Sequence, residues 1–219
     1  NGAKRWCTGA DWSDYIYCLT RSGPPEERYK NLTFLLIPTD APGVSMQGIE
    51  HSNLRYTKSM DVYFDNVRLP KSAIVGGEEN WNKGWKLLAG RALDVEKIEI
   101  TAVAYGIARA AVEEAWQYAQ EREQYGKPIG QHQAIRHKLV TARTKLQAAK
   151  HMLYHGAYLA NTDQPCSIET SMAKLYCADV GVEIATTCQQ VMGAYALSDA
   201  YDMERHVRDL LGMPIVNMM

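Results

Sequence analysis

The pattern of apolar and polar residues changes its period once along the chain. Up to about Pro70, short runs of β-branched and aromatic residues alternate with turn residues, and the clearest runs are KRWCTG, DYIYCLTRS, LTFLLIPTD and MDVYFDNVRLP. Gly23-Pro24-Pro25 and Ala41-Pro42-Gly43 predict loops, because proline fixes φ and glycine permits positive φ. This part of the chain therefore predicts antiparallel β structure.

From Trp85 onward the apolar residues recur with helical spacing. The predicted helices run from Trp85 to about Arg122, from Gln131 to Leu159, from Ser167 to Met192 and, more briefly, from Asp202 to Leu211. Gly126-Lys127-Pro128 is expected to end the first helix, and Ser167 to cap the third. Long helices with short connections favour an antiparallel bundle. We predict an α+β chain, with part of an antiparallel β domain over residues 1–75 and an antiparallel four-helix bundle over 76–219 whose last part is missing.

Composition and charge narrow the classes of function. The chain has 219 residues, 46% apolar and 22% charged, which is typical of a globular protein with a sizeable core. A net charge of -1 gives no bulk field for nucleic acid or an anionic membrane. Five cysteines without CxxC spacing argue against a disulfide framework or zinc site and favour a cytoplasmic location. The start, NGAKRW, has neither methionine nor a signal pattern, so we interpret the chain as an internal fragment.

Glu96, in LDVEKIEITAVAYG, is the first candidate for chemistry. On a helix it shares a face with Ile100, Val103 and Ile107, so one carboxylate interrupts an apolar stripe. A glutamate in a helix is usually solvated. If this one is desolvated, it is suited to act as a general base that removes a proton beside a carbonyl group.

Two other pairs of side chains carry weaker signals. His151 and His155 stand four apart and could share a metal, but no third ligand is evident, so we predict surface or packed histidines and no metal site. Cys177 and Cys188 lie eleven apart on one helix face, where buried thiols usually only pack.

An aromatic group near the start of the chain leaves two interpretations open. Trp6, Trp12, Tyr15 and Tyr17 could line a pocket for a flat ring or fill the core of a sheet. The core is the default expectation.

The order of these pieces resembles the acyl-CoA dehydrogenase family of flavoproteins. Five stretches carry the resemblance and together span nearly the whole chain: NGAKRWCTGADWSDY, SMDVYFDNVRLP, LDVEKIEITAVAYGIARAA, REQYGKPIGQHQAI and MERHVRDLLG. The resemblance implies the middle β domain and C-terminal helical domain of a longer protein. It also implies FAD as cofactor, an acyl-CoA substrate, an electron-transfer flavoprotein as electron acceptor, and a homotetramer or dimer of dimers without nucleic-acid or membrane partners.

The family motifs place cofactor contacts in three stretches. The residues implied to bind FAD are Trp6 and Thr8; Arg122, Gln124 and Tyr125; and Gln190 and Gly193. The first pair matches positions beside the isoalloxazine ring, and the second group matches a segment that reaches the dinucleotide's phosphates and adenosine across a subunit interface. The third pair matches a glycine-rich turn, which reads here Gly193-Ala194-Tyr195-Ala196.

The resemblance also assigns catalytic positions. In many members the base lies just before the helix that carries the Arg208-Asp209 pair, and that position is Ala200 here, which cannot take a proton. A smaller set, including isovaleryl-CoA and long-chain dehydrogenases, carries the base on the first bundle helix, where Glu96 falls. Glu96 is therefore the implied base, and the backbone N–H of Ala200 the implied donor to the thioester oxygen. Asp199 is a weaker rival base.

Substrate contacts follow from the same resemblance. Arg55 and Ser59 match the region that contacts the CoA moiety, while Leu93, Asp94 and Lys97 lie where the acyl and pantetheine channel is expected. The implied reaction is dehydrogenation of an acyl-CoA thioester to the trans-2-enoyl-CoA. An oxidase of similar fold and a noncatalytic subunit of a hetero-oligomer remain alternatives.

Overall fold

The computed structural model describes residues 1–216, and the chain divides into two compact units. The first unit, Asn1–Ala92, holds the longer strands, and the second begins at Leu93 and holds the long helices. The predicted α+β class with antiparallel strands and a helical bundle is confirmed. Residues 217–219, which the expected bundle domain includes, lie outside the described residues.

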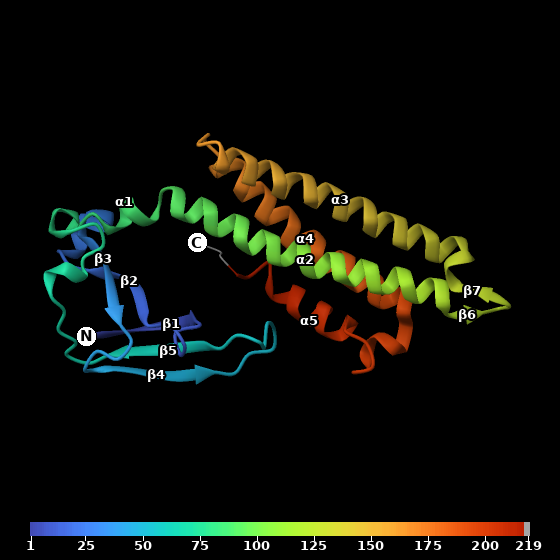
Figure 1. The fold of residues 1–219 in the computed structure, drawn as a ribbon, viewed down its shortest axis with the longest axis horizontal. Coiled ribbons are helices and arrows are strands. Elements are labelled where there is room, and N and C mark those ends of the chain that lie inside the picture. Colours follow the sequence, from blue (N-terminus) through green and yellow to red (C-terminus); the bar gives the residue numbers. More distant parts are fainter. Residues whose placement is uncertain (217–219) are drawn as a thin grey trace. The chain divides into compact units, whose positions relative to one another are not determined.

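Two antiparallel sheets form the first unit (Figure 1). One has the strand order β1–β5–β4 and the other pairs β2 with β3. The strands are β1 (Gly2–Thr8), β2 (Tyr15–Arg21), β3 (Leu32–Pro38), β4 (Val44–Ile49) and β5 (Ser59–Phe64). Met60 and Val62 of β5 form a small core with Ala10, against which Ile16 of β2 packs. The two sheets therefore share apolar side chains.

Short helical segments connect and follow these strands, namely η1 (Pro25–Asn31), η2 (Lys71–Ala73), η3 (Glu78–Asn80) and α1 (Gly84–Leu88). A Cβ atom on Gly84 would lie 2.6 Å from the backbone nitrogen of Phe34, so glycine lets α1 approach β3. Residues 76–92 belong to the first unit, together with the strands that α1 contacts. The predicted continuous helix from Trp85 is wrong, because a turn at Ala89 and Gly90 separates α1 from the next helix.

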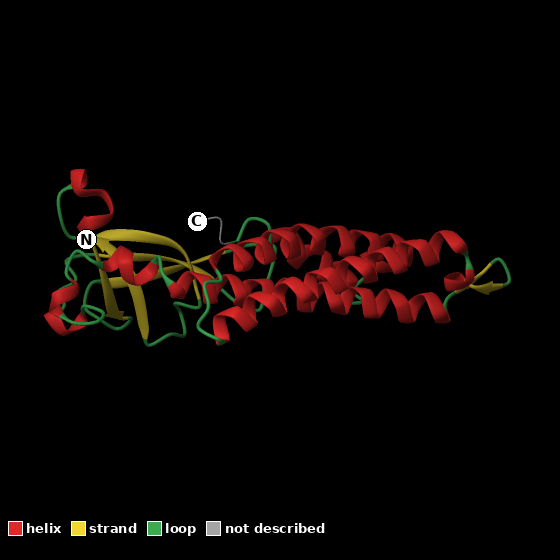
Figure 2. Ribbon diagram, turned by 90° about the horizontal axis from the view of Figure 1, so that it is seen from above, coloured by secondary structure: helices red, strands yellow, loops and turns green. Residues whose placement is uncertain are grey.

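The second unit is an antiparallel helical bundle, as predicted (Figures 1 and 2). Its helices are α2 (Arg91–Glu121, beginning in the first unit), α3 (Gln133–Asn161), α4 (Ser167–Met192) and α5 (Met203–Gly212). The connections contain the hairpin β6 (Glu123–Gln124) and β7 (Lys127–Pro128), and the turns η4 (Ile129–Gln131) and η5 (Gly193–Leu197). None of the helices over residues 1–216 has the length and apolar character that a membrane span requires.

Small side chains line the buried face of α2. The buried alanines recur at helical spacing, and they are Ala104, Ala108, Ala111, Ala115 and Ala119. Larger side chains from the other helices, including Leu146, Ile184 and Leu210, complete the core. The predicted cap is wrong by one residue: Cys166 occupies the N-cap of α4, while the Ser167 carbonyl accepts a hydrogen bond from the Ser171 hydroxyl.

Candidate functional site

Trp6 lies in a β-bulge of β1. Lys4 pairs with Val62 and Cys7 with Met60, so Arg5 and Trp6 together face the single residue Asp61 on β5. Trp6 has a φ of +63°, a conformation that bulky residues rarely adopt, and its side chain remains 62% exposed. A strained backbone here presents an aromatic ring outward.

Thr8 and Ser59 meet beside this bulge. Their hydroxyl oxygens are 3.0 Å apart in a hydrogen bond between β1 and β5. The family resemblance implies that Thr8 contacts the cofactor and Ser59 the substrate, and the structure shows the two residues as neighbours. Ser59 is buried, whereas Arg55, the other predicted substrate contact, is exposed in the loop before β5.

The expectation that the four aromatic residues fill a sheet core is wrong. Trp6, Trp12, Tyr15 and Tyr17 are each more than half exposed, and only the edge-to-face contact between Tyr17 and Phe34 pairs one of them with another ring in the described structure. The buried core consists instead of Ala10, Met60 and Val62, and Phe64 is the aromatic side chain that packs against it. The remaining interpretation, a surface for a flat ring, is compatible with this exposure.

Glu96 lies in the second turn of α2, half-buried. Ile100, Val103 and Ile107 of the same stripe are also half-buried, because the helix turns Thr101 and the alanines toward the bundle core. Glu96 thus borders the core of the bundle rather than interrupting it.

Two predicted substrate contacts beside Glu96 bind each other. Lys97 Nζ donates to Asp94 Oδ1 at 3.2 Å, and both side chains are less than a quarter exposed. Cys166 Sγ lies 4.0 Å from Asp94 Oδ2, so the beginning of α4 adjoins the beginning of α2. Leu93 is half-buried one residue before Asp94. This end of the bundle therefore combines Glu96 with a neutralised ion pair.

The predicted phosphate-binding residues gather at the other end of α2. The Arg122 guanidinium lies over the Tyr195 ring, 5.4 Å from its centroid, which joins the end of α2 to the turn after α4. Gln190 is exposed, and Gly193 has a φ of +65° with open space where a Cβ would stand. The structure thus brings together two of the three predicted cofactor stretches.

Gln124 and Tyr125 occupy the β6–β7 hairpin just beyond Arg122. The Gln124 carbonyl makes a 3.2 Å hydrogen bond with His132 Nε2, and the Tyr125 ring packs edge-on against the His132 ring at a centroid distance of 6.1 Å. Tyr125 has a φ of +56° and is 92% exposed. The hairpin projects its side chains into solvent.

The structure does not bring Ala200 near Glu96. The backbone N–H of Asp202 donates to Glu114 Oε1 at 2.9 Å. Glu114 follows Glu96 by 18 residues (114 − 96), which is about 27 Å along a helix, and the two residue steps from Ala200 to Asp202 span at most about 7 Å. The two predicted catalytic positions therefore cannot serve one centre within a chain. The Ala200 N–H faces Ser198 Oγ at 3.4 Å, and the rival Asp199 is exposed beside it.

A buried polar cluster around Glu114 was not predicted. Glu114 Oε2 is buried without a hydrogen-bond partner in the described structure, and His206 Nε2 lies 3.9 Å from it. Burial lowers the pKa of His206, and the nearby Glu114 carboxylate opposes this effect. The spacing of the sequence gives no signal for the cluster, because its members come from α2 and α5.

The thiols and histidines weighed from the sequence show no grouped chemistry. Cys177 and Cys188 are buried, and burial raises the pKa of each to about 12. His151 and His155 are exposed on α3. Over residues 1–216 no three histidine, cysteine or acidic side chains group as a metal site would require.

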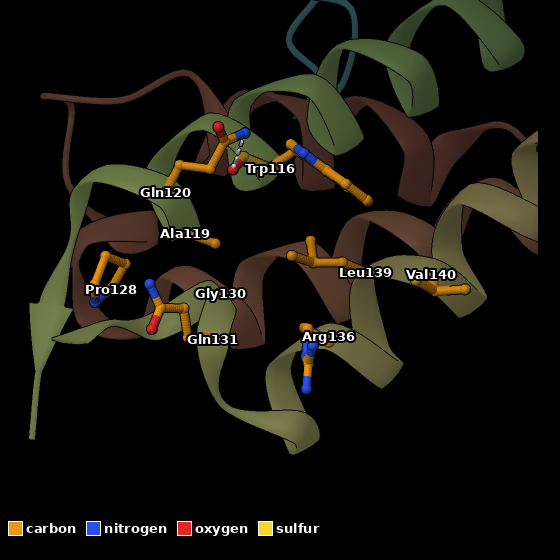
Figure 3. A pocket seen from close by; sticks show the side chains of 9 residues that line it. All are labelled: Trp116, Ala119, Gln120, Pro128, Gly130, Gln131, Arg136, Leu139 and Val140. Atoms are coloured by element: carbon orange, nitrogen blue, oxygen red, sulfur yellow. Dashed lines mark hydrogen bonds between the residues drawn. The ribbon is translucent and has the colours of Figure 1, made fainter.

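A cavity of ≈ 420 Å³ lies between the end of α2 and the beginning of α3 (Figure 3). Figure 3 shows the Trp116, Leu139 and Val140 side chains along it, with Gln120, Gln131 and Arg136 as polar members. None of the predicted catalytic, cofactor or substrate residues lines this cavity. Of its lining residues, Gln120 precedes the hairpin that carries Gln124 and Tyr125, and Pro128 belongs to that hairpin.

Comparison with known proteins supplies independent evidence. The model of the acyl-CoA dehydrogenase middle domain matches residues 1–67, and that of the acyl-CoA dehydrogenase C-terminal domain matches residues 82–217. The chain is 35% identical over 211 residues to a 3-(aryl)acrylate reductase of Clostridium sporogenes, covering 96% of this chain and 55% of the relative. It is 33% identical over 210 residues to a cyclohexane-1-carbonyl-CoA dehydrogenase of Geobacter metallireducens, covering 95% and 54%.

A solved structure agrees with the fold. Butyryl-CoA dehydrogenase of Megasphaera elsdenii matches with a TM-score of 0.93 and 27% identity, covering 99% of this chain and 55% of that one. The chain spans about half the length of the curated relatives it matches.

Proposed function

We propose a function from the premise that this chain belongs to the acyl-CoA dehydrogenase family. The full-length protein is an FAD-dependent dehydrogenase that converts an acyl-CoA thioester to the trans-2-enoyl-CoA. The observation that carries this proposal is the half-buried carboxylate of Glu96 near the start of the first bundle helix, where the family resemblance places a base. No other predicted base, including the distant Asp199, adjoins the predicted channel residues Leu93, Asp94 and Lys97.

The residues present fit a flavin dinucleotide. Trp6 offers an exposed ring and Thr8 a hydroxyl group on the same strand, which suit a flat, polar ring system. Arg122 offers the planar donors that bind phosphate, and Gly193 offers an uncovered backbone. When bound, FAD supplies the two-electron acceptor for the hydride that leaves the β-carbon of the substrate.

The length of α2 supports a proposal that its two ends belong to different copies of the site. Arg122 follows Glu96 by 26 residues (122 − 96), which corresponds to about 39 Å along a helix. This distance exceeds the reach of one bound dinucleotide. It supports the proposal that Arg122, Gln124, Tyr125, Gln190 and Gly193 contact the cofactor of a second subunit, in a homotetramer or dimer of dimers.

Glu96 performs the proton transfer in the proposed mechanism. Its carboxylate accepts the α-proton of the thioester as the Cα–Cβ double bond forms, and a half-buried position keeps the group partly out of water. Lys97 is held by Asp94, so this pair contributes position rather than free charge to the channel. Ala200 has no role beside Glu96 in this mechanism, because the geometry separates them.

The proposal extends to a substrate class and an electron acceptor. A base on the bundle helix favours branched, long or bulky acyl groups, and the relative named for a cyclohexane-1-carbonyl-CoA substrate supports a ring-bearing acyl group. Arg55 and Ser59 are the proposed contacts to CoA. An electron-transfer flavoprotein is the proposed acceptor of electrons.

A second candidate function runs the chemistry in the opposite direction. The relative with 35% identity is named a 3-(aryl)acrylate reductase, which favours reduction of an α,β-unsaturated aryl substrate as the alternative. In that direction Glu96 would give a proton to the α-carbon instead of accepting one. The two candidates therefore share the same acid–base residue.

Anaerobic visible spectroscopy of the full-length protein tests the proposal. A panel of acyl-CoA thioesters should bleach the flavin band, and Glu96→Gln should keep the band but slow bleaching by about 10²- to 10⁴-fold. Glu99→Gln, which changes an exposed glutamate one turn away, is the matched control and should match the wild type.

Each other outcome rejects a defined part of the proposal. Unchanged bleaching in Glu96→Gln removes Glu96 from the base role. A colourless protein that takes up no FAD favours the noncatalytic-subunit alternative, and rapid reoxidation of substrate-reduced protein by oxygen favours an oxidase. A pre-reduced protein that is reoxidised only by an arylacrylate favours the reductase.

A further inference from the structure

Arg5 and Asp61 form an ion pair across the β1 bulge. Arg5 Nε donates to Asp61 Oδ1 and Arg5 Nη2 donates to Asp61 Oδ2, each at 2.7 Å. Such a two-bond arrangement fixes the planes of both groups relative to each other. Because Asp61 is the single residue opposite Arg5 and Trp6, the pair joins the two strands where their regular pairing is interrupted.

The bulge needs such a restraint. Trp6 has a φ of +63°, which side chains of its size avoid, and its exposed ring gains little packing in return. Met60 and Val62 belong to the small core of this sheet, and Trp6 does not. A strained residue without burial holds its conformation only if neighbouring contacts fix it.

The ion pair shares a face of β5 with the hydroxyl pair. Side chains two residues apart on a strand point to the same side, so Asp61 and Ser59 lie on one face, and Arg5 and Thr8 reach them from β1. The Arg5 hydrogen bond lowers the pKa of Asp61, so the carboxylate stays ionised near neutral pH.

We propose that the Arg5–Asp61 pair is a positioning device that holds the bulge so that the Trp6 ring is oriented for the flavin ring. This inference rests on the proposed FAD-dependent function. Neither Arg5 nor Asp61 is assigned a contact with substrate; they act through Trp6. The pair is also electrically neutral, so it restrains the bulge without adding net charge beside Thr8.

Removing either partner should weaken FAD binding. If only about a tenth of the molecules keep the bulge in the binding conformation, the apparent dissociation constant rises about tenfold. We expect this change for Asp61→Asn, which removes the charge at constant shape. We also expect it for Arg5→Gln, which removes the 65% exposed partner and leaves the Asp61 carboxylate, 12% exposed, without its cation. Asp61→Glu retains a carboxylate and should restore most of the affinity.

The experiment is a titration of the full-length apoprotein with FAD, followed by flavin fluorescence. Glu78→Gln is the matched control, because it removes another 2.7 Å ion pair of the same unit, with Lys71, away from the bulge. Urea unfolding of each apoprotein separates positioning from general stability. The proposal expects FAD affinity to fall in Asp61→Asn and Arg5→Gln and to stay at the wild-type value in Glu78→Gln, with each apoprotein shown by its urea curve to be folded under the titration conditions.

Two results would overturn the proposal. One is FAD affinity within about twofold of the wild type in both Arg5→Gln and Asp61→Asn. The other is an equal loss of affinity in Asp61→Glu and Asp61→Asn, which would show that the ion pair itself is not what matters. If Asp61→Asn unfolds, Arg5→Gln decides alone.

Failure of the proposed function can be distinguished from failure of the ion-pair proposal. If the wild-type protein takes up no FAD, that function is rejected, and hydrogen exchange at residues 5–8 still tests the restraint. Faster exchange there in Arg5→Gln than in Glu78→Gln supports a pair that holds the bulge, and equal exchange rejects it.

Discussion

In the first unit, polar pairs fix the candidate residues, whereas in the second unit close packing of apolar side chains does so. The bulge that carries Trp6 is joined by Arg5 and Asp61, beside a small apolar core. The helix that carries Glu96 and ends beside Arg122 instead buries a row of alanines against its neighbours. The contrast indicates that the first unit should respond to lost hydrogen bonds, and the second to changes in side-chain volume.

The largest expected effect comes from removing volume in the helical unit. Leu146 is fully buried, and Leu146→Ala should lower the free energy of unfolding by about 2–5 kcal/mol through lost burial and a residual cavity. Leu175→Ala, on a helix but 63% exposed, is the control and should change it by less than about 0.5 kcal/mol. Urea unfolding measures both, and equal effects would contradict the role assigned to packing.

An intermediate effect is expected from a hydroxyl group in the first unit. The Ser22 hydroxyl is 2.6 Å from both Thr33 Oγ1 and Asn82 Oδ1, and it joins β2, β3 and the segment before α1. Ser22→Ala should lower the free energy of unfolding by about 1–3 kcal/mol, because the buried Thr33 and the half-buried Asn82 each lose a hydrogen-bond partner.

Exposed Ser45 of β4 provides the control for Ser22, since Ser45→Ala removes a hydroxyl from the same unit. Hydrogen exchange should show that the loss of protection in Ser22→Ala concentrates in β2 and β3. A loss no larger than that of Ser45→Ala would mean that this network does not hold the unit together.

The smallest expected effect on stability appears only at alkaline pH. It tests the close packing of the second unit through its buried thiols. Burial raises the pKa of Cys177 and Cys188 from 9.0 to about 12, so above pH 9 the unfolded chain loses thiol protons that the folded chain keeps. Stability should therefore fall as pH rises from about 9 to about 12. At pH 10 each thiol lowers the free energy of unfolding by about 1.4 kcal/mol relative to neutral pH.

Cysteine variants measure this contribution. Urea midpoints between pH 8 and about 10.5 should fall less steeply in Cys188→Ala than in the wild type, whatever the cost of the lost packing at neutral pH. Cys7→Ala, at a half-buried thiol of the first unit, should change the slope less. An unchanged slope in Cys188→Ala would show that its thiol ionises normally in the folded protein.

Helix positions follow from the sequence because their causes are local. The boundaries of α3 and α4 lie within about two residues of the predicted ones, since apolar periodicity and Pro165 mark them directly. Strand β4 was missed, because VSMQGI contains few β-branched residues and becomes a strand by pairing with β5. Tertiary pairing supplied what the local pattern lacked.

The candidate site also has residues that the sequence predicted and contacts that it did not. The family resemblance located Glu96 and Arg122, but no sequence pattern relates Arg5 to Asp61, which are 56 positions apart and meet only through the bulged register of β1 and β5. Ala200 was paired with Glu96 because the resemblance carries no distance along α2. Those relations depend on strand register and helix length in three dimensions, which a single sequence does not display.

The number of residues in helix α2 fixes the rotation of one end of the helix relative to the other. Each residue of an α-helix adds about 1.5 Å of rise but about 100° of rotation. One residue inserted between Glu96 and Arg122 would hardly change the span, yet it would turn the Arg122 end by more than a quarter of a circle relative to the Glu96 end. Residue types between the two can therefore change wherever volume allows, whereas a change of one in their number would rotate the proposed base and the proposed phosphate contact out of register with each other.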